Sequence, residues 1–158
     1  MIFKQFNFDG CLAYIIACGN RRKGAIIDPS HDAQPFLDFV ASQSLSIDYV
    51  IDTHTHVDHV SIAPELADIL GAKTVLSRLA PAQREIGSKV TELFGIEKIL
   101  AENAMNRIDM HLADGDELHI GDLTLKAIET KGHTQDHVSI FAVDRIFTGD
   151  TLLIGQCG

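Results

Sequence analysis

Hydrophobic and polar residues alternate over the first part of the chain with the period of two that strands show. A turn pair, Asp9-Gly10, and a second one, Gly19-Asn20, divide this region. The predicted strands cover residues 2–8, 11–18 and 24–28. Four apolar residues within 36–40 then fall on one face of a predicted helix.

Short apolar runs follow and alternate with helical patterns. Residues 48–51 and 73–77 are predicted buried strands, and a helix from about Ile62 to Leu70, stopped by Gly71, lies between them. The stretch from Pro81 to about Arg107 has a mostly helical composition. Two hairpins are predicted further on, made by 118–120 with 123–128 and by 138–143 with 145–147. This mixture favours a single layered α/β domain over residues 1–158, with helices outside sheets.

The composition narrows the class of protein. Hydrophobic residues make up 46% and charged residues 22%, which excludes a disordered chain. The 13 basic and 22 acidic residues give a net charge of −9, which argues against nucleic acid or an anionic membrane as a partner. No apolar run approaches the roughly 18–20 residues of a membrane span. Three cysteines without a CxxC pair fit a reducing compartment, and no targeting segment is recognised, so we expect a cytoplasmic protein.

The sharpest chemical signal is Thr53-His54-Thr55-His56-Val57-Asp58-His59, directly after an apolar run. In extended backbone His54 and His56 project to the same side, and two converging imidazoles make half of a first-row metal site. Asp58 and His59 come one loop turn later, where they would bind a second metal or act as a base and its partner. A lone His-x-His is more often a solvated loop. The full motif at the end of a buried strand favours a metal.

Two shorter motifs add to this set. Lys131-Gly132-His133-Thr134 and Thr148-Gly149-Asp150-Thr151 each follow a predicted strand, and each places one ligand type beside a glycine that lets backbone approach closely. Either motif alone is more often a turn. Together with the histidines of the first motif, these two motifs supply the imidazoles and the carboxylate that a metal site needs.

These motifs, in this order, resemble the metallo-β-lactamase superfamily over nearly the whole chain. The resemblance implies an αββα sandwich, of which this chain would supply the N-terminal half to two-thirds, so that the domain is incomplete at its C-terminus. An uncovered sheet face would then favour a homodimer. The metal ligands that the resemblance implies are His54, His56 and His133 at a first site, Asp58 and His59 at a second site, and Asp150 as the bridging carboxylate.

Within the superfamily the chain is most similar to the glyoxalase II branch and, inside it, to persulfide dioxygenases, on residues 76–83 and 147–158. This similarity implies one Fe²⁺ per chain on His54, His133 and Asp150, with open positions for substrate and O₂. Glutathione persulfide, or a similar small persulfide, would be oxidised to sulfite and thiol. The segment 135–137 departs from the Pro-Gly usual in that family, and its last residue, His137, is similar to the glyoxalase II pattern instead.

Two alternatives stay open. The first is a Zn²⁺-dependent thioester hydrolase of the glyoxalase II type, in which the metal lowers the pKa of water toward 7 and Asp58, with His59, has the catalytic role. The second is a metal-binding fragment without turnover. Among the other residues, Asp28 is expected to hydrogen-bond ligand histidines. The cysteines are expected to be inert, with Cys11 and Cys18 in the core and Cys157 a buried spectator.

Overall fold

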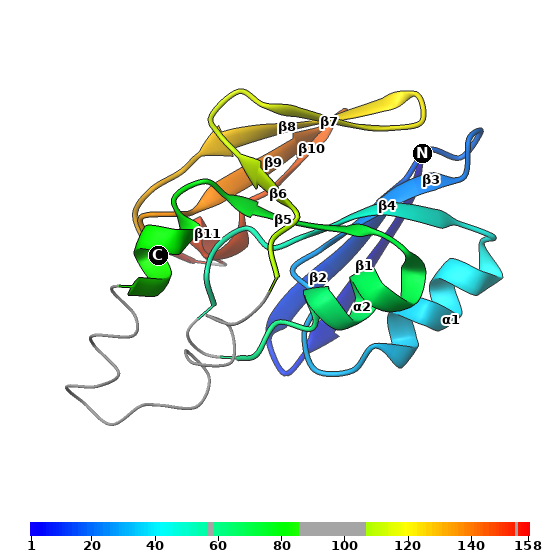
Figure 1. The fold of residues 1–158 in the computed structure, drawn as a ribbon, viewed down its shortest axis with the longest axis horizontal. Coiled ribbons are helices and arrows are strands. Elements are labelled where there is room, and N and C mark those ends of the chain that lie inside the picture. The colour runs from blue at the N-terminus through cyan, green and yellow to red at the C-terminus, as the bar shows by residue number, and fades with distance from the viewer. Residues whose placement is uncertain (57–58, 86–106, 154) are drawn as a thin grey trace.

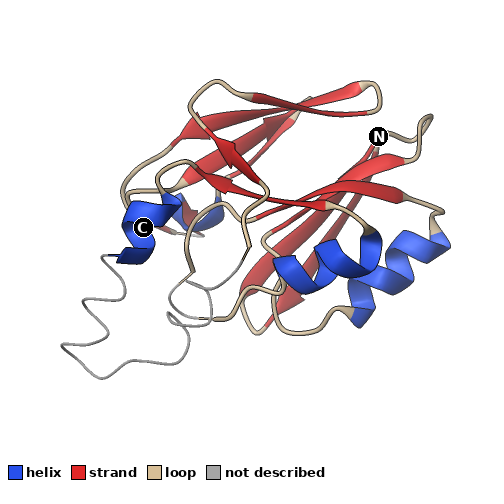
Figure 2. Cartoon of the chain, viewed as in Figure 1, coloured by secondary structure: helices blue, strands red, loops and turns tan. Residues whose placement is uncertain are grey.

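A computed structural model describes residues 1–56, 59–85, 107–153 and 155–158. Two β-sheets lie face to face, and helices cover the outer side of the first sheet (Figures 1 and 2). The first sheet contains, in spatial order, β1 (Ile2–Phe8), β2 (Cys11–Ala17), β3 (Lys23–Ile27), β4 (Ser46–Ile51), β5 (Lys73–Ser77) and β6 (Met110–Leu112). The second sheet contains β10 (Arg145–Phe147), β9 (Val138–Ala142), β8 (Leu123–Glu129) and β7 (Glu117–Ile120). A 3₁₀ turn, η1 (Gly149–Thr151), leads to the small pair β11 (Leu152–Leu153) and β12 (Gln156–Cys157).

The first sheet changes from antiparallel to parallel along its width. Strands β1, β2 and β3 pair antiparallel, whereas β3, β4, β5 and β6 pair parallel. Parallel neighbours need crossover connections, and the helices α1 (Gln34–Ser42) and α2 (Ala63–Leu70) supply two of them. Gly71 ends α2 in the left-handed region, at φ +67°, as the sequence predicts. The carboxyl ends of β3, β4 and β5 therefore meet at one edge of the sheet.

Each face of the first sheet has its own apolar core, because strand side chains alternate between faces. In β2, Ile15 packs with the cluster that includes Phe36 of α1 and Leu66 of α2. The next residue, Ile16, packs with the cluster between the two sheets, which also includes Phe147. The layered α/β fold expected from the sequence is thus confirmed, with helices outside two stacked sheets.

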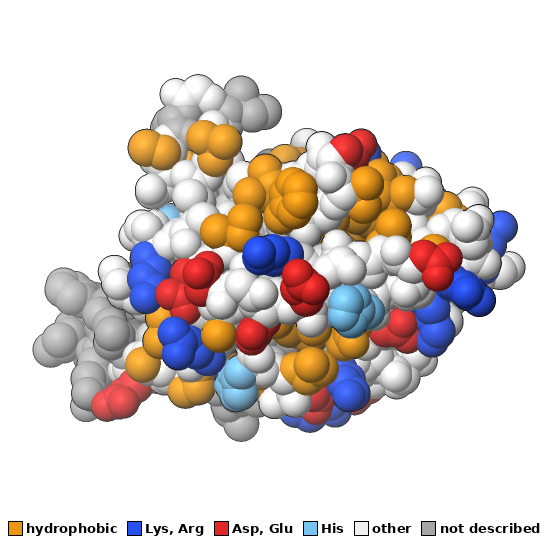
Figure 3. All heavy atoms as spheres, turned by 90° about the horizontal axis from the view of Figure 1, so that it is seen from above, with side chains coloured by type: hydrophobic (Ala, Val, Ile, Leu, Met, Phe, Trp, Pro, Cys, Tyr) orange, Lys and Arg blue, Asp and Glu red, His pale blue; other side chains and the backbone are white. Residues whose placement is uncertain are grey.

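The outer face of the second sheet presents apolar side chains to solvent. Phe141 and Ile146 are paired across β9 and β10 and are 43% and 47% exposed, and Val143 in the turn between them is 56% exposed. Figure 3 looks down on the molecule from this side and shows hydrophobic groups spread between charged side chains and histidines. Exposed polar residues of β7 and β8, such as His119 and Lys126, share the second sheet with these apolar side chains.

The predicted strands and helices are confirmed to within a few residues at their ends, and the differences lie in short elements. Strand β6 was not predicted, because its three residues acquire strand structure only by pairing with β5. The two-residue strands β11 and β12 were missed for the same reason. Of the helical stretch expected from Pro81 to Arg107, residues 80–85 are helical and 86–106 lie outside the described residues.

Candidate metal centre

Three loops bring the sequence motifs together at one end of the two sheets (Figure 1). Residues 53–56 follow directly after the parallel strand β4. His133 lies in the loop between β8 and β9, and Asp150 lies in η1 after β10. A backbone hydrogen bond of 2.8 Å from the Val138 N–H to the Thr53 carbonyl joins the loops of the two sheets. The site is therefore built between the sheets and not within one of them.

His54, His133 and Asp150 form the centre of this arrangement. One possible ligand atom from each of the three lies within 4.8 Å of those of the other two. The Asp150 Oδ2 is 3.5 Å from the His133 Nε2 and 3.9 Å from the His54 Nε2. His54 is buried, whereas the side chains of His133 and Asp150 are 28% and 38% exposed. The cluster thus runs from the interior to the solvent and leaves one side open.

Hydrogen bonds determine which nitrogen of His54 can bind a cation. The Thr53 hydroxyl has one proton, which it donates to Asp28 at 2.9 Å, so its oxygen accepts from the His54 Nδ1–H at 3.0 Å. The His54 Nε2 then carries the lone pair, and it is buried without a hydrogen-bond partner among the described residues. Burial, with the neighbouring imidazoles, moves the pKa of His54 far below its usual value, which keeps the ring neutral. A neutral imidazole nitrogen facing a second imidazole and a carboxylate fits a divalent cation.

Asp28 was expected to hydrogen-bond the ligand histidines, but its hydrogen bonds go to Thr53, which precedes His54. Asp28 accepts the Thr53 N–H at 2.6 Å as well as the hydroxyl, and one of its oxygens is 3.5 Å from the His56 Nε2. Asp52 is 3.8 Å from the same nitrogen, and burial raises the pKa of this carboxyl to about 6. Asp28, Asp52 and His56 thus form a second, fully buried group of possible ligands. Because its two carboxylates face the Nε2 of His56, we interpret this group as support that orients the His56 ring.

The other predicted ligands are placed beside the central group. The rings of His54 and His56 have centroids 4.2 Å apart, and those of His56 and His59 are also 4.2 Å apart. Asp58 lies outside the described residues. The structure therefore brings His54, His133 and Asp150 into one cluster and sets His56 and His59 next to it.

A cavity of about 540 Å³ adjoins the centre and contains a residue that the sequence analysis assigned wrongly. Cys11 was expected in the core, but it is partly exposed, lines this cavity and has its Sγ 3.9 Å from the His59 Nδ1. Cys18 is buried as expected, whereas Cys157 is exposed and not a buried spectator. The Asp9-Gly10 turn was the available signal, since it places Cys11 at a hairpin end and not in a strand centre.

The sequence distinguishes His137 only by its similarity to the glyoxalase II pattern. This residue is fully buried, and its ring stacks on His54 with centroids 4.9 Å apart and an interplanar angle of 16°. Its Nδ1 is 3.0 Å from the Thr130 hydroxyl and 3.1 Å from the Thr151 hydroxyl. His137 therefore supports the ring of His54, and nothing in the local pattern of residues 135–137 shows this.

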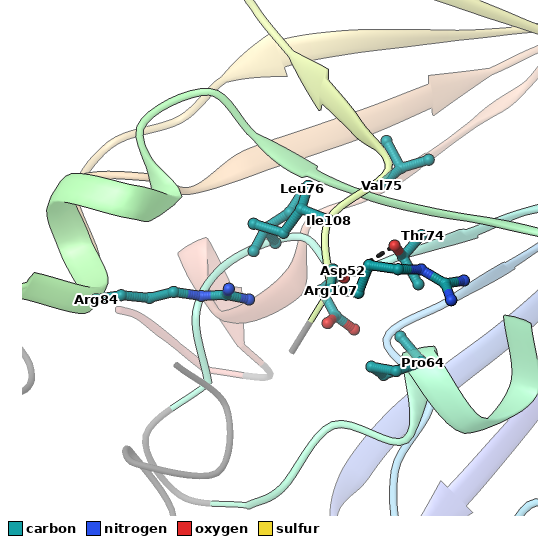
Figure 4. A pocket seen from close by; sticks show the side chains of 9 residues that line it. Asp52, Pro64, Thr74, Val75, Leu76, Arg84, Arg107 and Ile108 are labelled. Atoms are coloured by element: carbon teal, nitrogen blue, oxygen red, sulfur yellow. Dashed lines mark hydrogen bonds between the residues drawn. The ribbon is translucent and has the colours of Figure 1, made fainter. Parts of the chain in front are cut away.

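Arg84, a partly buried arginine, lines a small cavity together with Asp52. Figure 4 shows Arg84 extending from the helical residues 80–85 into a small cavity that Asp52 also lines. Burial lowers the pKa of Arg84, and the charges of Asp52 and Asp136 oppose that shift. Arg84 thus partly compensates the negative charge of two buried carboxylates.

Comparison with known proteins agrees with this geometry. The sequence model of the family described as "Metallo-beta-lactamase superfamily" matches residues 6–158, so the chain belongs to this superfamily. It is 30% identical over 151 residues to the hydroxyacylglutathione hydrolase of Idiomarina loihiensis, covering 96% of this chain and 50% of that protein. It is 29% identical over 149 residues to the human mitochondrial persulfide dioxygenase ETHE1, covering 92% of this chain and 49% of that protein.

A solved structure is similar over almost the entire chain. The crystal structure of ETHE1 from Myxococcus xanthus superposes with a TM-score of 0.77 at 29% identity, and the match covers 97% of this chain and 59% of the other. The chain spans about half the length of the curated relatives named above. None of the described helices is both long and apolar enough to cross a membrane.

Proposed function

We propose that this chain holds one metal ion, Fe²⁺, on His54, His133 and Asp150, and that it acts in the oxidation of a low-molecular-weight persulfide by O₂. The observation that carries the proposal is the cluster of ligand atoms within 4.8 Å, which has two imidazoles, one carboxylate and one open side. Two histidines and one carboxylate are the ligand set of non-haem iron oxygenases. The similarity to persulfide dioxygenases supports the choice of substrate.

In the proposed reaction the outer sulfur of the persulfide is oxidised and O₂ is reduced. The balanced form is RSSH + O₂ + H₂O → RSH + H₂SO₃, in which the S–S bond breaks and the inner sulfur leaves as the thiol. The bound iron would supply the open coordination positions for substrate and O₂. Thr53 and Asp28 would fix the tautomer of His54, and the adjoining cavity, with apolar side chains such as Leu152 and Leu153, would receive the substrate.

A second candidate is thioester hydrolysis of the glyoxalase II type with Zn²⁺. The rings of His56 and His59 next to the central cluster favour it, because they would contribute to a site with two metals. Similarity to a hydroxyacylglutathione hydrolase supports this candidate, at 30% identity against 29% for the persulfide dioxygenase.

Metal content and two substrates separate these candidates. We would purify the protein anaerobically from cells supplied with iron and zinc, and determine the metals by elemental analysis. About one iron per chain, with O₂ uptake on glutathione persulfide, would support the dioxygenase. Zinc, with loss of absorbance from S-lactoylglutathione, would support the hydrolase. Bound metal with neither activity would indicate a metal-binding chain without turnover, and absence of metal would contradict the proposal.

A single substitution tests the ligand assignment. His133→Ala removes one of three ligands, so we expect the bound metal to fall from about one per chain to nearly none by elemental analysis. His119→Ala is the matched control, because His119 is an exposed residue of β7 outside the cluster. Equal metal content in His133→Ala and the wild type would contradict the assignment.

A further inference from the structure

A buried carboxylate reaches the metal-binding loop from the second sheet. Asp136 lies in the loop before β9 and is 0% exposed. Its Oδ2 accepts two hydrogen bonds from Thr55, one from the backbone N–H at 3.0 Å and one from the hydroxyl at 2.6 Å. Thr55 stands between His54 and His56. Asp136 therefore holds both the backbone and the side chain of the residue that joins these two histidines.

Thr53, two residues before Thr55, is held in the same way by a carboxylate that follows a strand of the first sheet. Asp28, which follows β3, accepts the N–H and the hydroxyl of Thr53 at 2.6 and 2.9 Å. The two threonines alternate with His54 and His56 along the loop. Each threonine is thus fixed by its own aspartate, and the loop is held from both sheets at once. Hydrogen bonds to a carboxylate are charge-assisted and so stronger than those between neutral groups.

Asp136 also belongs to the loop that carries His133, three residues before it. The contact between Asp136 and Thr55 therefore ties the loop of His54 directly to the loop of His133. These two histidines approach Asp150 from different sheets, so their spacing depends on how the loops are joined.

We propose that Asp136 is a positioning residue of the metal centre, which sets the spacing of His54 and His133 before a metal binds. This inference rests on the metal site of the proposed function. Asp136 is not itself in the ligand cluster. Loss of residues that orient metal ligands commonly lowers metal affinity about 10- to 100-fold. We expect a loss of that size when the contact between Asp136 and Thr55 is broken.

Two variants break the contact from opposite sides. Asp136→Ala removes the acceptor, and Thr55→Val removes the hydroxyl donor in a residue of similar shape, while Thr55→Ser retains the hydroxyl. Affinity for Co²⁺ would be measured by competition with a chelator, together with the visible spectrum of the Co²⁺ form. Unfolding of the metal-free protein by urea would report the fold separately. We expect Asp136→Ala and Thr55→Val to weaken Co²⁺ binding at least about 10-fold and to change the spectrum, and Thr55→Ser to restore both toward the wild type.

The chain contains a matched control. Thr74, which like Thr55 is buried, donates its N–H to one oxygen of Asp109 at 2.9 Å. Its hydroxyl is 3.0 Å from the same oxygen and 2.9 Å from the Arg107 carbonyl. This pair joins β5 to the residue before β6, and neither Thr74 nor Asp109 belongs to the ligand cluster found among the described residues. Thr74→Val should lower the stability of the fold without changing Co²⁺ affinity or spectrum.

The experiment distinguishes failure of this inference from failure of the proposed function. Unchanged affinity in Asp136→Ala and Thr55→Val, or an equal loss in Thr74→Val, would overturn the inference and leave the proposed function intact. If Asp136→Ala does not fold, Thr55→Val and its serine partner decide the question. A wild-type protein that binds no Co²⁺, Fe²⁺ or Zn²⁺ would overturn the proposed function and this inference with it.

Discussion

At the scale of the residue, the centre depends on a position where no side chain fits. Gly149 has φ +45°, and a Cβ there would collide with the Thr53 hydroxyl and lie 2.7 Å from the His137 Nε2. Both neighbours support His54, one by hydrogen bonding and one by stacking. The glycine next to Asp150 is therefore required by packing as well as by backbone conformation.

This argument predicts a loss of stability when a methyl group is added at this position. Gly149→Ala should lower the free energy of unfolding by about 1–3 kcal/mol through overpacking, in addition to the cost of the left-handed backbone. Gly71→Ala is the control, since Gly71 also has positive φ, at +67°, but a Cβ there would meet no atom within 4 Å from other described parts of the chain. Urea denaturation of the metal-free variants measures the difference. Equal losses in the two variants would show that packing against Thr53 and His137 is unimportant.

At the scale of the element, the parallel strand β6 relies on an anchor at its start. It pairs with β5 through three residue pairs. Asp109, just before it, accepts the N–H of Thr74 on β5 and lies 3.0 Å from the hydroxyl of that residue. The backbone hydrogen bond from Thr74 is the main reason that the pKa of Asp109 lies below its usual value. A lowered pKa means that the folded protein favours the charged carboxylate.

The stabilisation from Asp109 should therefore depend on pH. It is present above the unfolded-state pKa of about 3.9 and is lost as the pH falls through the lower folded-state pKa. We expect Asp109→Asn to destabilise the protein at pH 7 and the difference from the wild type to shrink below about pH 4. Urea unfolding of both proteins at several pH values measures this. A difference that stays constant down to pH 3 would contradict the assignment.

At the scale of the whole molecule, burying the histidines between two sheets makes folding sensitive to protons. Burial lowers the pKa of both His54 and His137, so the folded protein holds these rings neutral. Below the unfolded-state pKa of about 6.5, the unfolded chain takes up protons that the folded chain does not. The contribution to stability is thus complete above that pH and is lost progressively below it.

The metal-free protein should consequently be less stable at pH 5.5 than at pH 7.5. Urea unfolding in the presence of a chelator measures this. His119→Ala is the control, because His119 is an exposed residue of β7 outside the group of buried histidines. Equal stability of the metal-free protein at both pH values would contradict the role of the buried rings.

The sequence alone determined the elements and the types of ligand. Strands β1 to β5, helices α1 and α2, and the hairpins of the second sheet follow from local periodicity and turn residues, which act between near neighbours in the chain. The His54 and His56 motif identified the end of β4 as a site for the same reason, because strand geometry fixes the direction of side chains two residues apart.

Only the tertiary structure decided which of these residues meet and what holds them. Thr55 and Asp136 are 81 residues apart in the chain, and their contact exists because the two sheets stack. The place of Cys11 at the cavity and strand β6 arise in the same way. The grouping of His54 with His133 and Asp150 was implied by the family resemblance, and the structure places their ligand atoms within 4.8 Å of one another. Contacts between distant segments depend on the packing of layers, and no local pattern of residue types records that packing.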